Sequence, residues 1–294
     1  MRERPLVGVA LLLLALFCFA LLDATSKHLS QIYPVPLLVW ARYTLHCLIM
    51  VLTLAPSMRM KLIATRRPLA QIVRGSLLVA VTGLAMAAFR IAPLAEATAL
   101  LFVAPLFVIA LAGPLLGEKA GRLRWMAVLA GFGGTLLIAR PGGAVSATGI
   151  ALTLTAAVCY SFYQIMTRRL SATESTVTML FYTALMGSLL MTLGLPWFWG
   201  GPRPTPGDAL MIASLGVYGG VGHFLLIRAF RHAPASMLSP FQYIQLVWAT
   251  LLGWGIYGQL PDGLSILGMV IVVGSGLLVA LAERRRHVVP EQSR

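Results

Sequence analysis

Charged residues are scarce in this chain. Only 11% of its 294 residues are Asp, Glu, Lys or Arg, whereas a soluble domain carries about 25%. Hydrophobic residues make up 59%, and the mean hydropathy is +0.85. A soluble globular protein needs polar side chains over its surface, and this chain has too few of them. The composition excludes a soluble enzyme, a disordered chain and a nucleic-acid module, and it leaves a polytopic membrane protein.

The residues and motifs that usually carry catalysis or drive transport are also missing. The three cysteines, Cys18, Cys47 and Cys159, lie in apolar runs and suggest neither a disulfide framework nor a metal site. The five histidines are scattered, and no His-Glu-x-x-His occurs. No Gly-x-x-x-x-Gly-Lys-Ser/Thr run is present, so this chain does not use ATP itself. We therefore expect no enzyme, no metal and no cofactor.

Long apolar runs predict an all-α integral membrane protein with ten transmembrane helices. A helix needs about 20 apolar residues to cross the hydrocarbon core. The runs do not alternate in polarity as barrel strands would. The predicted spans are 6–26, 36–55, 70–89, 94–116, 124–140, 147–168, 176–195, 208–230, 236–258 and 263–282.

Acidic residues number only 9 against 23 Lys and Arg, which gives a net charge of +14. We attribute this excess to cytoplasmic loops, which collect Lys and Arg, and not to nucleic-acid binding. Basic clusters occupy every second loop, as 59–67, 119–124 and 284–286 illustrate. The intervening loops contain only Lys27, Arg90, Arg140 and Arg203. The alternation predicts a multi-pass protein of the cell inner (cytoplasmic) membrane with both termini cytoplasmic.

The two halves of the chain repeat each other at a shift of 141 residues. Phe-Arg-Ile-Ala-Pro at 89–93 recurs as Phe-Arg-His-Ala-Pro at 230–234. Each unit holds five spans, an odd number, so the second must enter the membrane from the opposite side. We therefore predict two inverted five-helix repeats, 1–141 (spans 1–5) and 142–294 (spans 6–10 and a basic tail). Inverted repeats are typical of secondary transporters.

These features resemble the drug/metabolite transporter superfamily of the EamA type. The resemblance rests on the ten spans, the Ala-Pro turn before span four, Pro-Leu-Leu-Gly-Glu at 114–118 and the stretch from Asp23 to Arg42. In the family a Glu follows Leu-Gly in both repeats, but here the second copy has Gln259. The resemblance implies export of small organic metabolites, with amino acids including aromatic ones as the expected substrates. A multidrug or other metabolite exporter is the alternative, and a channel is less favoured.

Charged side chains inside or beside the spans are the first candidates for a site, because charge in a bilayer is expensive. Asp23 and Arg42 have matching depths near the outer ends of spans one and two. Glu96 begins span four near Arg90. Two interpretations are open for these four residues. They either lie at the outer opening of the transport path, where they act as a gate or bind a zwitterionic substrate, or they form structural ion pairs that hold the helices together.

The 141-residue shift also indicates a cavity face on equivalent helices, where an aromatic residue lies one turn from a polar one. The first repeat contributes Phe19, Asp23, Thr98 and Phe102, and the second contributes Tyr160, Gln164, Ser239 and Tyr243. Rings with a few polar groups suit a pocket for a small-molecule substrate. The alternative is that these side chains face lipid or neighbouring helices.

Further candidates are Gln245 and Trp248 in span nine and His223 in the glycine-rich span eight. A lone histidine is also compatible with ordinary packing. Small residues in spans five and ten predict a packing scaffold away from the substrate path. Pairing of these two spans between protomers would give a homodimer, so both a monomer and a homodimer stay open. The expected partners are a small-molecule substrate and the lipid bilayer, without nucleic acid.

Overall fold

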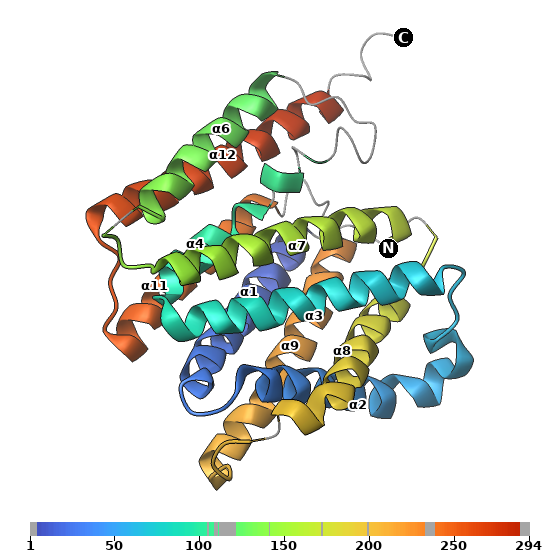
Figure 1. The fold of residues 1–294 in the computed structure, drawn as a ribbon. Coiled ribbons are helices and arrows are strands. Elements are labelled where there is room, and N and C mark those ends of the chain that lie inside the picture. Colours follow the sequence, from blue (N-terminus) through green and yellow to red (C-terminus); the bar gives the residue numbers. More distant parts are fainter. Residues whose placement is uncertain are drawn as a thin grey trace, which may run out of the picture.

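The computed structural model describes residues 5–104, 106–108, 111, 122–140, 142–171, 173–198, 200–232 and 239–288. Within these ranges every regular element is helical. Figure 1 shows them as a bundle with one helix pair set to the side. The elements are α1 Pro5–Ser30, α2 Val35–Met58, η1 Arg59–Leu62, α3 Pro68–Ile91, α4 Leu94–Leu101, α6 Arg122–Ile138, α7 Ala147–Ser171, α8 Thr176–Phe198, α9 Pro206–His232, η2 Ser239–Tyr243, α11 Ile244–Tyr257 and α12 Gly263–Val288.

Six of these helices are long and apolar enough to cross a membrane, and three shorter apolar helices accompany them. The predicted all-α membrane fold is thus confirmed, and most predicted spans differ from the helices by a few residues at their ends. The prolines that begin helices fit this pattern. Pro68 and Pro206 start α3 and α9, where the missing N–H would have no helical partner.

The helix contacts show the two-fold repetition that the sequence predicts. α1 packs along α9, and α3 packs along α7, which is the same pair under the 141-residue shift. α2 with α9 corresponds to α8 with α3 in the same way. The pairs α2–α8 and α6–α12 each correspond to themselves. Each repeat therefore buries its helices mainly against the other repeat, and the ten spans form two interlocked inverted units.

Two glycines show how closely the repeats match. A Cβ on Gly75 of α3 would lie 3.0 Å from Met186 Cβ of α8, and one on Gly216 of α9 would lie 2.5 Å from Leu45 Cβ of α2. Both the glycines and their neighbours are 141 residues apart. Small residues let membrane helices approach closely. The same backbone contact is therefore built twice, once in each inverted setting.

Hydrogen bonds join loops of the two repeats at both ends of the bundle. We call the end with the α1–α2 turn the α1–α2 end, and the opposite end, with the α2–α3 connection, the α2–α3 end (Figure 1). At the first, the Tyr33 hydroxyl donates to Asp208 Oδ2 at 2.9 Å. At the second, the Arg66 N–H donates to Glu174 Oε1 at 3.0 Å. Tyr33 and Glu174 correspond under the shift, so different chemistry ties equivalent loops together.

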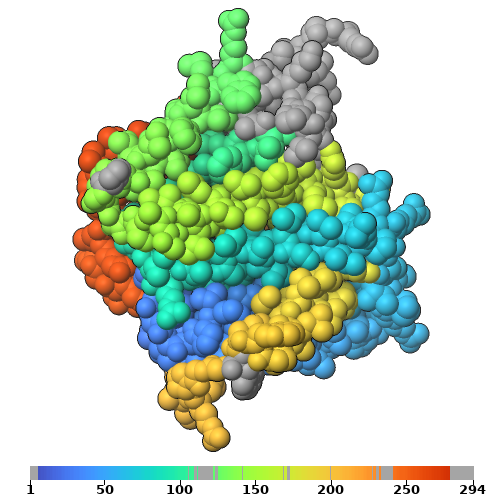
Figure 2. Space-filling view, viewed as in Figure 1, coloured from blue at the N-terminus to red at the C-terminus, as the bar shows by residue number. Residues whose placement is uncertain are grey.

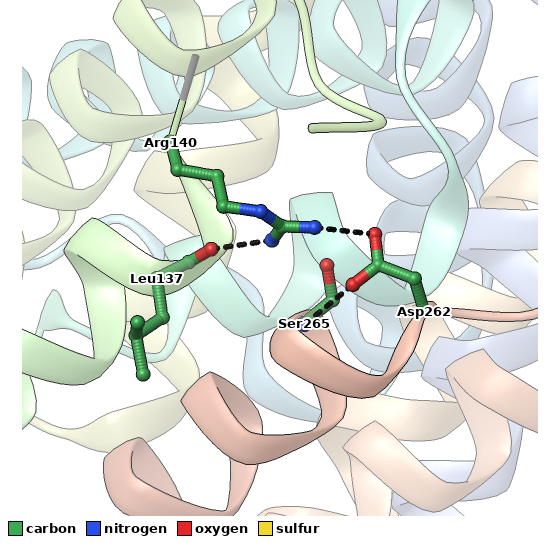
Figure 3. Close-up of polar contacts among 4 residues, drawn as sticks. All are labelled: Leu137, Arg140, Asp262 and Ser265. Atoms are coloured by element: carbon green, nitrogen blue, oxygen red, sulfur yellow. Dashed lines mark hydrogen bonds and ion pairs between the residues drawn. The ribbon is translucent and has the colours of Figure 1, made fainter. Parts of the chain in front are cut away.

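The paired helices α6 and α12 lie apart from the other spans (Figure 1). Their backbones nearly touch, because a Cβ on Gly134 would lie 2.7 Å from the carbonyl oxygen of Gly268. The small residues thus allow the close packing that the sequence predicts, and the pairing occurs within one chain. Figure 3 shows a polar lock between them, in which Arg140 Nη2 donates to Asp262 Oδ2 at 2.7 Å and Ser265 N donates to Asp262 Oδ1.

Within the described residues, spans four and nine are interrupted. Helix α4 ends at Leu101, Phe102 and Val103 form a turn, and residues 104 and 106–108 are helical again, while Ser239–Tyr243 forms the 3₁₀ helix η2 directly before α11. Pro105 follows the first break in the sequence, and proline cannot continue the helical hydrogen bonds. Residues 112–121, which include the Pro-Leu-Leu-Gly-Glu motif, lie outside the described residues.

Candidate functional site

Asp23 is the centre of a polar cluster to which both repeats contribute. Its Oδ2 accepts a hydrogen bond of 3.1 Å from Nε2 of Gln245, which lies 222 residues further along the chain on α11. Arg42 on α2 interacts electrostatically with the Asp23 carboxylate. Two of the predicted side chains thus form a bond across the repeats. The matching depth of Asp23 and Arg42 places them in electrostatic range, but the hydrogen-bond partner is Gln245.

His223 continues this cluster toward the middle of the bundle. Its ring stacks on His46 at 6.4 Å between centroids and meets the edge of Phe19 at 5.0 Å. Arg42 interacts electrostatically with both histidines. The glycine run of α9 makes room for these side chains, since a Cβ on Gly222 would lie 2.6 Å from Phe19 Cε1. Gly222 therefore leaves room for the Phe19 ring, which in turn meets His223.

Several of these residues keep accessible surface. Asp23, Arg42 and His223 are each only partly buried, whereas Gln245 is 6% exposed. We call the set Asp23, Arg42, His223 and Gln245 the central cluster. Tyr160, on α7, is 37% exposed.

Aromatic side chains form pairs on α1, α7 and α11 and beside the interruptions of spans four and nine. Tyr160 stacks on Tyr163 at 5.7 Å, and Trp248 meets the edge of Phe17 at 4.9 Å. Phe102 and Tyr243, which correspond under the shift, contact each other at 5.5 Å between centroids. Both lie where their spans are interrupted, Phe102 directly after α4 and Tyr243 at the junction of η2 and α11. In membrane carriers, interrupted helices commonly form the substrate site.

The remaining predicted residues are more dispersed. Thr98 is buried, and its hydroxyl has no partner in the part of the chain described, whereas Gln164 is half-buried on α7. The side chain of Ser239 lies outside the described residues. Glu96 is 1% exposed and interacts electrostatically with Lys27. Arg90 is exposed at the end of α3 and lines a cavity with Lys27.

Sequence reasoning missed Arg74, which is 1% exposed. Its guanidinium donates to Thr167 of α7 at 3.2 Å, to Thr183 of α8 at 2.9 Å and to the carbonyl oxygen of Met179. It also lies over the Tyr163 ring, 5.0 Å from the centroid. The signal was available, because Arg74 falls inside the predicted span 70–89.

No three His, Cys, Asp or Glu side chains in the described ranges come close enough to hold a metal ion. The arrangement is instead a cluster of opposite charges, an amide and histidine rings to which both inverted repeats contribute. Such a fold, with interrupted spans at equivalent places, defines the class of membrane carriers.

The chain belongs to the EamA-like transporter family, which matches residues 6–140 and again residues 147–281. The family lies in the drug/metabolite transporter superfamily, as the sequence motifs indicated. The protein is accordingly a transporter and not an enzyme.

Named relatives and a solved structure agree with this placement. An S-adenosylmethionine uptake transporter of Rickettsia bellii is 28% identical over 75% of each chain. A riboflavin transporter of Vibrio cholerae is 28% identical over 97% of this chain and 96% of its own. A crystal structure superimposes with a TM-score of 0.65 at 22% identity, over 96% of this chain and 98% of that one. The last similarity concerns the fold alone.

Proposed function

We propose that this protein is a secondary transporter that moves small organic metabolites across the cytoplasmic membrane by alternating access. The observation that carries the proposal is the central cluster, in which α1 and α2 of the first repeat meet α9 and α11 of the second. A solute bound there contacts both repeats at once. Tilting one repeat against the other would then open the cluster to each side in turn.

For the substrate class we propose zwitterionic metabolites that carry a planar ring, with aromatic amino acids as the simplest members. Asp23 suits an ammonium group and Arg42 suits a carboxylate, since Arg binds carboxylates through paired hydrogen bonds. Tyr160, Phe102 and Tyr243 offer ring faces. S-adenosylmethionine combines an α-amino carboxylate with a planar base, so it belongs to the same class, whereas riboflavin shares only the planar ring.

We further propose that the α1–α2 end faces outward and that both termini are cytoplasmic. The basic loops at 59–67 and 284–286 support this orientation. Export was the expectation from the family resemblance, but one relative is named for uptake of S-adenosylmethionine and another as a riboflavin transporter. Because the chain has no ATP-binding loop, we propose that the solute gradient sets the direction.

The test is counterflow in proteoliposomes that contain only this protein. Labelled phenylalanine, S-adenosylmethionine and riboflavin would each be offered to vesicles loaded with the unlabelled compound. We expect saturable uptake of the first two that is stimulated by the trans solute and lost in Asp23→Ala. Flux that rises linearly with concentration would indicate a channel. Uptake of riboflavin alone would contradict the proposed substrate class while leaving the carrier mechanism in place.

A further inference from the structure

A cavity of about 370 Å³ lies at the α1–α2 end, one helical turn beyond the central cluster along α1. Its lining includes Lys27, Gln31, Arg90, Tyr257 and Gln259. Lys27 is four residues from Asp23, so the two side chains share one face of α1. The size is that of a pocket for a small metabolite. We call this space the outer cavity.

The lining of the outer cavity contains two cationic residues and no acidic one. Lys27 is 5% exposed, and its ammonium donates to the carbonyl oxygens of Phe89 and Ala92 at 2.8 and 2.5 Å. An ammonium group has three donors, so one is left for a ligand. Its charged neighbour Glu96 is not part of the lining. The carbonyls fix the ammonium in place without cancelling its charge.

Arg90 supplies the second positive charge. It lies on the exposed last turn of α3, and among the described residues its guanidinium has no hydrogen bond or ion pair. Only its backbone carbonyl is used, as acceptor for Gln31 Nε2 at 2.8 Å. The guanidinium is therefore available for paired hydrogen bonds to a planar anion. A held ammonium and an available guanidinium on one cavity wall complement a carboxylate.

We infer that the outer cavity is an anion-binding subsite, which receives the carboxylate of a small metabolite before or after its passage through the central cluster. The role in transport rests on the proposed function, whereas the binding of a carboxylate does not. The ring of Tyr257, 5.3 Å from the Lys27 ammonium, closes one side of the cavity and favours a ligand with an apolar portion next to its anionic group.

The binding test uses the purified full-length protein with benzoate and benzamide, which differ in charge but hardly in shape. A ligand that binds the folded state raises the midpoint of thermal unfolding with its concentration. We expect benzoate to stabilise the protein at lower concentration than benzamide. In Arg90→Gln the half-saturating benzoate concentration should rise about tenfold, the size of one charge-assisted hydrogen bond, and Arg90→Lys should lie between the two.

Arg203→Gln is the matched control, because it removes the same charge from an exposed loop at the same end. Its benzoate titration should equal that of the unchanged protein. An equal loss in both Gln variants would reduce the effect to the general positive field and overturn the inference. Equal binding of benzoate and benzamide would also overturn it. So would stabilisation by phosphatidylglycerol micelles without any by benzoate, because the occupant would then be a lipid headgroup.

A flux measurement separates this inference from the proposed function. In phenylalanine counterflow, Arg90→Gln should raise the half-saturating concentration and leave the maximal rate unchanged. If the unchanged protein shows no saturable flux, the proposed function fails, while the benzoate titration still decides whether the outer cavity binds anions.

Discussion

Arg42 and Arg74 occupy corresponding corners of the two repeats, but their surroundings differ. The corner of α1, α2 and α9 holds Arg42 among Asp23, His46 and His223, with accessible surface. The corner of α3, α7 and α8 holds Arg74, fully buried and bonded to Thr183. Thr183 is the residue that the 141-residue shift pairs with Arg42. The guanidinium of Arg74 therefore reaches the place in its corner that Arg42 has in the other.

The same backbone packing in the two repeats therefore does not determine which role the arginine has in each corner. Gly75 and Gly216 give both corners the same close helix contact. In one corner the arginine fastens three helices together, and Figure 2 shows α3, α7 and α8 packed side by side on one face. In the other corner Arg42 is only partly buried, and we propose that its charge meets a solute. A carrier needs such asymmetry, because one side of its path must be closed while the other is open.

The largest expected effect comes from removing the two arginines in turn. Arg74→Ala deletes the hydrogen bonds that join α3 to α7 and α8 and leaves their buried acceptors unpaired, so it should lower the free energy of unfolding by about 3 kcal/mol or more. Arg42→Ala should lower it by less than about 1 kcal/mol, because that side chain is partly accessible. Denaturant titration in detergent micelles measures both. Equal losses of unfolding free energy in the two variants would mean that both arginines stabilise the fold to the same extent.

Asp23→Asn tests the open corner through transport. The amide keeps the shape and can still accept a hydrogen bond from Gln245, but it loses the charge that we assign to a solute ammonium. Counterflow of phenylalanine should fall about tenfold or more, the value of one charge-assisted interaction, while the unfolding midpoint stays close to that of the unchanged protein. Glu174→Gln, an acidic residue at the opposite end, is the control and should transport normally. Normal flux in Asp23→Asn would remove Asp23 from the site.

The two corresponding glycines allow the corners to be compared by packing alone. Gly216→Ala places a Cβ 2.5 Å from Leu45 Cβ, which cannot move without the backbone of α2. Overpacking of this kind costs about 1–3 kcal/mol. Gly75→Ala meets Met186 Cβ and Cγ at 3.0 Å and should cost less, because the contact is looser. Thermal unfolding of both variants gives the order. A larger loss for Gly75→Ala would show that the corner of Arg74 is the more tightly packed.

The sequence predicted the features that depend on local composition and on repetition. Apolar runs and alternating loop charges gave the spans, and the Phe-Arg-x-Ala-Pro pair gave the inverted repeat. It did not predict which residues touch. The hydrogen bond of Asp23 with Gln245 depends on how α1 and α11 are rotated about their own axes. No local sequence pattern predicts a contact between residues 222 positions apart. The interruptions near Phe102 and Tyr243 also escaped, because apolar runs continue through them. Only the prolines nearby hinted at these breaks.

The smallest effect concerns the lock between α6 and α12, outside both corners (Figure 3). The Ser265 backbone N–H and the Arg140 guanidinium hold the pKa of the Asp262 carboxyl below its usual range. A group whose folded pKa is lowered stabilises the protein above its unfolded pKa of about 3.9 and loses that contribution as the pH falls through the folded value. Stability should therefore be insensitive to this group at neutral pH and decline below about pH 4.

Asp262→Asn should lack that component of the decline, seen as a flatter plot of unfolding midpoint against pH. The loss should be modest, since the pair is partly exposed at 24% and 46% of the two side chains and salt screens it. An unchanged plot would mean that α6 and α12 are held by the contact of Gly134 with Gly268 and not by the ion pair.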